Sequence, residues 1–144
     1  MLIGIDPILS PDALALLRAM GHGDTVALAD ANFPSEANAR RLVRLDGAGG
    51  EQVLDAVLRL LPIDDFEPDP LVAMQAVGAT EGMPDAVAAF QRVVVHRLGA
   101  SAPRIALVDR HAFYARARNA FGIIATAERR FYGNLILRKG VIPA

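Results

Sequence analysis

His22 lies between two glycines in the run Met20-Gly21-His22-Gly23-Asp24, directly after an expected helix. Histidine has an unperturbed pKa of about 6.5, so this side chain type can both give and take a proton near neutral pH. The flanking glycines carry no Cβ, which lets a small ligand approach the backbone closely. The motif therefore predicts a proton-transfer site for a small molecule. The alternative interpretation is an exposed turn histidine that follows a helix C-cap.

Asp30 and Arg110 each follow a short apolar run that predicts a strand. The Asp30 carboxylate could accept hydrogen bonds from sugar-like hydroxyls or act as a base, or it could simply form an Asx-turn. Arg110 begins an expected helix, where a cation opposes the helix dipole, and this placement favours a ligand-facing role unless Asp109 neutralises it. Both residues fall at carboxyl ends of strands, where open α/β sheets bind ligands. Phe113 and Tyr114 are expected to pack in the core.

A third polar segment, Tyr132-Gly133-Asn134, precedes the last apolar run. The tyrosine hydroxyl and the asparagine amide offer the donors and acceptors that a polyol requires. Gly133 would let a backbone N–H group approach the ligand. The alternative is an ordinary turn before a strand.

Other kinds of site are disfavoured by the residues present. The chain has no cysteine, which excludes disulfides, thiolate nucleophiles and cysteine-based zinc sites. Its three histidines, His22, His96 and His111, show no i, i+4 or His-x-His spacing, so we expect no metal. Neither a phosphate-binding P-loop, nor GxGxxG, nor a GxSxG nucleophile elbow occurs.

The composition bounds the class of protein. A chain of 144 residues fits one domain, residues 1–144, and a hydrophobic fraction of 53% indicates a well-buried core or extensive subunit contacts. A formal net charge of −1 argues against a nucleic-acid partner. No apolar run approaches the roughly 20 residues of a membrane span, and the N-terminus does not resemble a signal peptide. We therefore expect a cytoplasmic protein without a membrane partner.

Hydrophobic periodicity and capping signals predict an alternation of strands and helices. The expected helices are residues 11–20 after the Ser10 cap, 51–61, 84–98 and 110–120 after the Asp109 cap. The expected strands are 26–29, 42–45, 71–77, 104–108, 122–127 and 135–137, with 31–41 a polar connection. The strands are apolar without polar alternation, which favours an α/β layered fold with a largely parallel sheet flanked by helices.

Several motifs, in order along the chain, resemble the L-fucose mutarotase branch of the D-ribose pyranase and fucose mutarotase family. The pair MGHGD and DANFP at this separation is fairly specific, whereas YGN alone is weak. The matching segments are Leu17-x-x-Met20-Gly21-His22-Gly23-Asp24, Asp30-Ala31-Asn32-Phe33-Pro34, Val43-Arg44-Leu45-Asp46-Gly47, Arg110-x-Ala112-Phe113-Tyr114 and Tyr132-Gly133-Asn134.

The resemblance implies a cofactor-free enzyme that interconverts sugar anomers. It also implies a ribose pyranase-like α/β fold that assembles into homo-oligomeric rings, usually decamers, with sites near subunit contacts. On the family pattern His22 matches the catalytic acid/base. The matches to sugar-binding positions are Asp30, Arg110, Tyr132, Gly133 and Asn134.

Three other functions remain open from the sequence. D-ribose pyranase activity, in which pyranose and furanose forms interconvert, belongs to the same family. A non-catalytic monosaccharide-binding protein would bind sugar without accelerating anomer exchange. A structural ring-former would bind no sugar.

Overall fold

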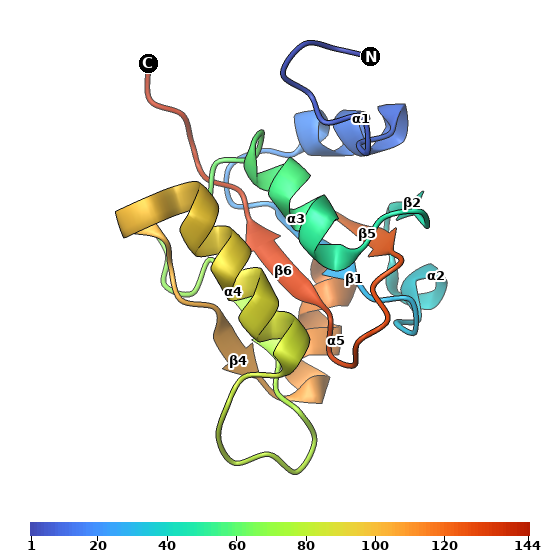
Figure 1. Ribbon diagram of the computed structural model, residues 1–144, viewed down its shortest axis with the longest axis vertical. Helices are drawn as coiled ribbons and strands as arrows, with labels where there is room; N and C mark the ends of the chain where they lie inside the picture. Colours follow the sequence, from blue (N-terminus) through green and yellow to red (C-terminus); the bar gives the residue numbers. More distant parts are fainter.

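The computed structural model describes residues 1–144 and contains one six-stranded sheet covered by helices on both faces (Figure 1). The strands are β1 (Thr25–Ala29), β2 (Leu42–Leu45), β3 (Leu71–Met74), β4 (Ala106–Val108), β5 (Gly122–Thr126) and β6 (Leu135–Arg138). The helices are α1 (Pro11–Ala19), α2 (Ser35–Asn38), α3 (Gly50–Leu58), α4 (Asp85–Leu98) and α5 (Arg110–Asn119), with a 3₁₀ turn η1 (Gly99–Ser101) after α4. The predicted α/β fold is confirmed.

Two of the helices begin at the caps that the sequence predicts. The Ser10 hydroxyl accepts a hydrogen bond from the Ala13 N–H at 3.2 Å at the start of α1. The Asp109 carboxylate accepts one from the Ala112 N–H at 2.9 Å at the start of α5. Each cap satisfies a backbone donor that the first helical turn leaves without a partner. The cap of α5 makes Arg110 the first residue of the helix, just after the carboxyl end of β4.

The two faces of the sheet bury separate hydrophobic clusters, because successive strand side chains point to opposite faces. Helices α1, α3 and α4 cover one face and bury Leu28, Leu71 and Leu135 among 25 clustered residues. Helix α5 lies behind the sheet in Figure 1 and packs Phe113 and Ala117 against the other face. Strands buried on both faces explain the apolar runs without polar alternation.

Strand β6 runs antiparallel to both of its neighbours, β1 and β3, in the order β2-β5-β1-β6-β3-β4. The other ladders, β1 with β5, β2 with β5 and β3 with β4, are parallel. Therefore the start of β6 lies at the same edge of the sheet as the carboxyl ends of β1 and β3. The segment before β6 is thereby brought next to the segment after β1.

The largest differences between the structure and the predicted elements are in three places. The short helix α2 occupies part of the expected polar connection 31–41. Helix α3 ends at Leu58, and the N–H groups of Leu60 and Leu61 both turn back to the Val57 carbonyl. Strand β3 ends at Met74, where its pairing with β4 stops. No helix is both long and apolar enough to cross a bilayer.

Candidate functional site

A pocket of about 360 Å³ opens at the carboxyl ends of β1 and β3, beside the first turn of α5. This volume lies within the range typical of small-molecule sites. Its polar lining is Asp30, Asn32, Arg110, Tyr132 and Asn134, and its apolar lining is Phe33, Met74, Val77, Tyr114 and Phe131. The fold thus brings together four of the six residues that the sequence singled out, although Asp30 and Asn134 are 104 positions apart.

Asp30 and Asn134 form a buried two-point hydrogen bond at the base of this pocket. The Asp30 N–H donates to Asn134 Oδ1 at 2.9 Å, and Asn134 Nδ2 donates to Asp30 Oδ2 at 2.7 Å. Burial raises the pKa of the Asp30 carboxyl above its usual value, although hydrogen bonds from Asn32, Asn134, Phe33 and Gly133 favour the charged form. An ionised carboxylate with a raised pKa is a stronger acceptor for a ligand hydroxyl.

The Tyr132 hydroxyl faces the loop that follows β3. It accepts a hydrogen bond from the Val77 N–H at 3.1 Å. Because that bond uses an oxygen lone pair, the hydroxyl hydrogen remains free to be donated to a ligand. Tyr132 has a φ of 60°, in the left-handed region that is costly for a residue with a side chain. Val77 and Phe131 are strongly exposed at the rim of the pocket.

Arg110 and Tyr114 form the α5 wall of the pocket. The Arg110 guanidinium carbon lies 5.3 Å from the centre of the Tyr114 ring, a cation–π contact. Tyr114 also packs on Phe33, with ring centres 5.0 Å apart. Phe113 is buried in the core as predicted. Tyr114 packs against the same core cluster but is only partly buried. It lies one helical turn after Arg110, on the same side of α5, and therefore also lines the pocket.

Gly133 is buried and is not among the residues that line the pocket. A Cβ atom at this position would lie 2.5 Å from Glu128 Cγ and 3.1 Å from the Arg130 carbonyl oxygen. Close packing of the loop backbone on Glu128 therefore requires glycine here. This requirement is separate from the ligand approach that the sequence suggested.

His22 lies at the opposite edge of the sheet from this pocket. It precedes β1 whereas Asp30 follows it, and a five-residue strand spans about 17 Å. The turn that carries His22 is bound to the end of β6, because the Gly23 N–H donates to the Lys139 carbonyl and the Lys139 N–H to the Asp24 carbonyl, both at 2.9 Å. Gly23 has a φ of 84°, which glycine adopts without strain.

The partner of the His22 ring is Asp64, which the sequence analysis did not identify. His22 Nε2 lies 3.1 Å from Asp64 Oδ1, and the ring packs against Phe66 with centres 5.3 Å apart. Asp24, in the same turn, does not contact the ring and accepts a hydrogen bond from the Gly21 N–H at 2.8 Å. Asp64 is 42 positions from His22 in an acidic loop, so no local spacing could reveal the contact.

Asp64 fixes which ring nitrogen of His22 is available for chemistry. Burial opposes ionisation of this carboxyl, but hydrogen bonds from His22 and from the Phe66 and Glu67 N–H groups together hold its pKa below the usual value. An ionised carboxylate accepts hydrogen bonds only, so Nε2 of His22 carries a hydrogen. Nδ1 is therefore the nitrogen that can take up a proton.

The histidines do not assemble a metal site. No group of three or more His, Cys, Asp or Glu side chains is placed to hold a metal ion. His96 and His111 are both exposed on helices, on α4 and α5 respectively. The polar residues of the pocket can instead bind a small ligand rich in hydroxyl groups.

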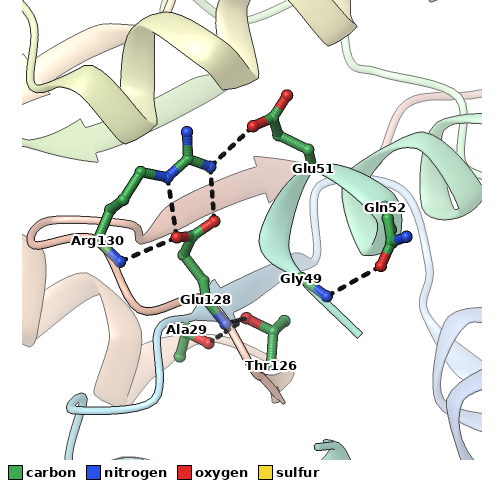
Figure 2. Close-up of polar contacts among 7 residues, drawn as sticks. All are labelled: Ala29, Gly49, Glu51, Gln52, Thr126, Glu128 and Arg130. Atoms are coloured by element: carbon green, nitrogen blue, oxygen red, sulfur yellow. Dashed lines mark hydrogen bonds and ion pairs between the residues drawn. The ribbon is translucent and has the colours of Figure 1, made fainter. Parts of the chain in front are cut away.

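A buried carboxylate, Glu128, lies in the loop between β5 and β6 (Figure 2). Its Oε1 accepts hydrogen bonds from the N–H and the Nε of Arg130, both at 2.9 Å, and its Oε2 accepts one from Arg130 Nη2 at 2.7 Å. Arg130 Nη2 also donates to Glu51 at 2.8 Å. The Arg130 side chain lowers the pKa of Glu128 to about 2 against the opposing effect of burial.

This ion pair makes the stability of the fold depend on pH. The pKa of Glu128 is lower in the folded chain than its ordinary value of 4.5, so its contribution is complete above pH 4.5 and is lost as the pH falls toward 2. A shift of this size corresponds to about 3 kcal/mol at most, because Arg130 is partly exposed. Urea titration should give wild type a larger free energy of unfolding than Glu128→Gln at pH 6–7. The difference between the two free energies should become smaller as the pH falls toward 2. A constant difference across this range would contradict the assignment.

Known proteins resemble the chain over nearly its whole length. The model of the RbsD / FucU transport protein family matches residues 3–142. The chain is 38% identical over 143 residues to the L-fucose mutarotase of Histophilus somni (strain 2336), and 37% identical to that of Actinobacillus pleuropneumoniae serotype 5b (strain L20), each match covering 99% of both chains.

Solved structures share the fold. The fucose mutarotase from Streptococcus pneumoniae in complex with L-fucose superposes with a TM-score of 0.91 at 36% identity, covering 99% of this chain and 100% of that one. Bacillus subtilis RbsD complexed with D-ribose has the same fold, with a TM-score of 0.71 at 18% identity over 94% of this chain and 95% of that one. By sequence over nearly its whole length and by fold, the chain belongs to the RbsD / FucU transport protein family.

Proposed function

We propose that the protein is a mutarotase that interconverts the α and β anomers of L-fucose, or of a stereochemically similar monosaccharide, with His22 as proton donor and acceptor. The observation that carries the proposal is the pocket in which Asp30, Arg110, Tyr132 and Asn134 converge. The similarity to L-fucose mutarotases over 99% of the chain supports the choice of sugar. A cytoplasmic location, expected from the sequence, belongs to the same proposal.

The pocket offers complementary groups for a deoxy sugar. Asp30 would accept hydrogen bonds from sugar hydroxyls, while Arg110 only donates and Tyr132 has a free hydroxyl hydrogen. Asn134 keeps one amide hydrogen beyond the one that it gives to Asp30. The apolar side of the pocket, which includes Met74 and Phe33, suits the methyl group of a 6-deoxy sugar.

Mutarotation requires only proton transfers. The anomeric hydroxyl loses a proton, the ring oxygen gains one, and the bond between the anomeric carbon and the ring oxygen breaks to give an open aldehyde. Closure on the other face of the aldehyde reverses these transfers and gives the other anomer. A positioned acid/base accelerates such a reaction by about 10²–10⁴-fold, and no electron transfer or covalent intermediate is involved, so we propose no cofactor.

His22 reaches such a pocket only when two copies of the chain associate. Within one chain it lies at the opposite edge of the sheet from Asp30, and the length of β1, about 17 Å, lies between them. Its side chain is 47% exposed, and Phe66 beside it is 70% exposed. Val77 and Phe131 are exposed at the pocket rim. Docking the His22 edge of one copy on the pocket of the next would cover Phe66 of the one and Val77 and Phe131 of the other. Repetition of such a contact generates a ring when its rotation closes, and the family resemblance implies a decamer.

The first prediction concerns activity. NMR exchange spectroscopy should show faster α–β exchange of L-fucose with the wild-type protein than without it. His22→Ala should abolish the acceleration, because the proton shuttle is lost, while its circular dichroism spectrum is unchanged. Acceleration of D-ribose pyranose–furanose exchange alone would indicate a pyranase. Saturable sugar binding without faster exchange would indicate a binding protein, and retained full activity in His22→Ala would refute the role of that residue.

A second prediction compares the effects on kcat of replacing Asp64 and Asp24, the two aspartates near His22. Asp64→Asn keeps the size of the side chain but removes the charge that holds the Nε2 hydrogen, so kcat should fall at least about tenfold. Asp24→Asn is the matched control, because Asp24 contacts the Gly21 backbone and not the ring, and its kcat should stay within about twofold of wild type. Equal losses in the two variants would argue against Asp64 as the positioning partner of His22.

A third prediction tests whether two copies share the site. His22→Ala and Asp30→Ala should each be inactive alone, because each removes one half. After the two are mixed under conditions that dissociate the oligomer, and then reassembled, about one quarter of the sites would combine an intact His22 with an intact Asp30. Activity should therefore return to about a quarter of wild type in the mixture. Mixing that yields heteromers by mass spectrometry but no activity would place both residues in one copy.

A further inference from the structure

The loop between β5 and β6 carries Tyr132 and Asn134 and is closed by an ion pair that proton transfer does not use. The Glu128 side chain is 7% exposed, and each of its oxygens accepts a hydrogen bond from the guanidinium of Arg130 (Figure 2). The same carboxylate accepts a bond from the Arg130 backbone N–H. These three contacts fix the direction of the chain two residues before Tyr132.

The backbone of Glu128 joins this loop to the segment that carries Asp30. The Glu128 carbonyl accepts a hydrogen bond from the Ala31 N–H at 2.8 Å. Its N–H donates to the Thr126 hydroxyl at 3.2 Å, and that hydroxyl donates to the Ala29 carbonyl at 2.9 Å, as Figure 2 shows. Of the two residues that flank Asp30, Ala29 is thus bonded to Thr126 at the end of β5 and Ala31 to Glu128 in the loop. Movement of Glu128 would therefore disturb both walls of the pocket.

The side chain of Glu128 also supports the backbone directly after Tyr132. A Cβ atom on Gly133 would lie 2.5 Å from Glu128 Cγ, so the two residues are in close contact. Tyr132 keeps its left-handed φ of 60° only while neighbouring contacts hold it there. On its other side, Glu128 Oε2 would lie 3.2 Å from a Cβ on Gly50, in the first turn of α3, where the helix dipole favours a carboxylate.

We propose that Glu128 is a positioning residue for sugar binding, holding the Tyr132-Gly133-Asn134 segment so that the Tyr132 hydroxyl and the Asn134 amide face the ligand. This inference rests on the proposed function, because the segment is assigned to the sugar there. Arg130 acts with Glu128 as the second half of the same support. Glu51 contacts Arg130 at the surface, where both side chains are about 40% exposed, and contributes little.

The test combines kinetics with a direct readout of the loop. In Glu128→Gln the carboxylate charge is lost and one oxygen becomes an amide that cannot accept from Arg130, so the segment loosens. KM for L-fucose should rise about tenfold with a smaller change in kcat, because the segment holds the sugar in both the ground state and the transition state. A merely structural role would instead lower the amount of active protein, and so kcat, with KM unchanged.

The chain has only two tyrosines, Tyr114 and Tyr132, so meta-fluorotyrosine labelling gives two fluorine NMR signals. Tyr132→Phe assigns them. In Glu128→Gln the Tyr132 signal should shift or broaden while the Tyr114 signal is unchanged. This readout needs no activity, so it still decides the positioning role if the wild-type protein fails to accelerate anomer exchange and the proposed function falls.

Glu51→Gln is the matched control, and both its KM and its Tyr132 signal should match wild type. If Glu128→Gln does not fold, Arg130→Gln removes the same pair of guanidinium–carboxylate hydrogen bonds by changing the more exposed partner. This variant should also raise KM. The proposal is overturned by a KM within twofold of wild type in the folded variants, by a loss of kcat alone, or by equal changes in both tyrosine signals.

Discussion

The arrangement of the pocket depends on one topological constraint, the insertion of an antiparallel strand between two parallel ones. Because β6 runs against β1 and β3, the residues before it lie beside the residues after β1. Asn134 can then form its two buried hydrogen bonds with Asp30 across 104 positions of sequence. Were β6 parallel, Asn134 would lie at the other edge of the sheet, beside the His22 turn. The direction of a single strand thus decides which polar groups share the pocket.

Three buried carboxylates show how this fold assigns different properties to one chemical group. Burial dominates at Asp30, whose partners are neutral, and raises its pKa. Asp64 and Glu128 are just as buried, but hydrogen bonds from the His22 ring and the Arg130 guanidinium lower the pKa of each. Asp30 is therefore suited to accept from a ligand, whereas the other two are committed to orienting a neighbouring side chain. The hydrogen-bond partner of each buried carboxylate therefore determines the direction of its pKa shift and the role that it can take.

The helices and strands could be predicted because their signals are local. Ser10 and Asp109 begin helices by capping, and apolar runs without alternation indicate strands buried on both faces. The antiparallel direction of β6 could not be predicted, since nothing in Leu135–Arg138 records which strands will flank it. The position of Asp30 at a strand end could be predicted because the apolar run before it is local. Its contact with Asn134 could not, because that contact depends on the direction of β6.

The residues of the site divide along the same line. Motif resemblance pointed to His22, Asp30, Arg110 and the Tyr132–Asn134 segment, and the fold brings all but His22 to one region. Asp64 could not be predicted as the partner of His22, because it is one of several acidic residues in the same loop. Only the structure shows that Asp64 is the one buried against the histidine. Glu128 was not predicted because a Glu-x-Arg spacing carries no sign of burial, whereas in the structure its side chain is 7% exposed and packs against Gly133.

The separation of His22 from the pocket gives subunit association a chemical consequence in the proposed assembly. One chain alone holds the groups proposed to bind sugar, but its histidine lies beyond the far end of β1, a strand about 17 Å long. Docking of a second copy would then supply the acid/base and, at the same time, exclude water from the pocket mouth through Phe66, Val77 and Phe131. Binding would require one chain and catalysis two, so dissociation of the oligomer would abolish turnover before it abolished recognition of the sugar.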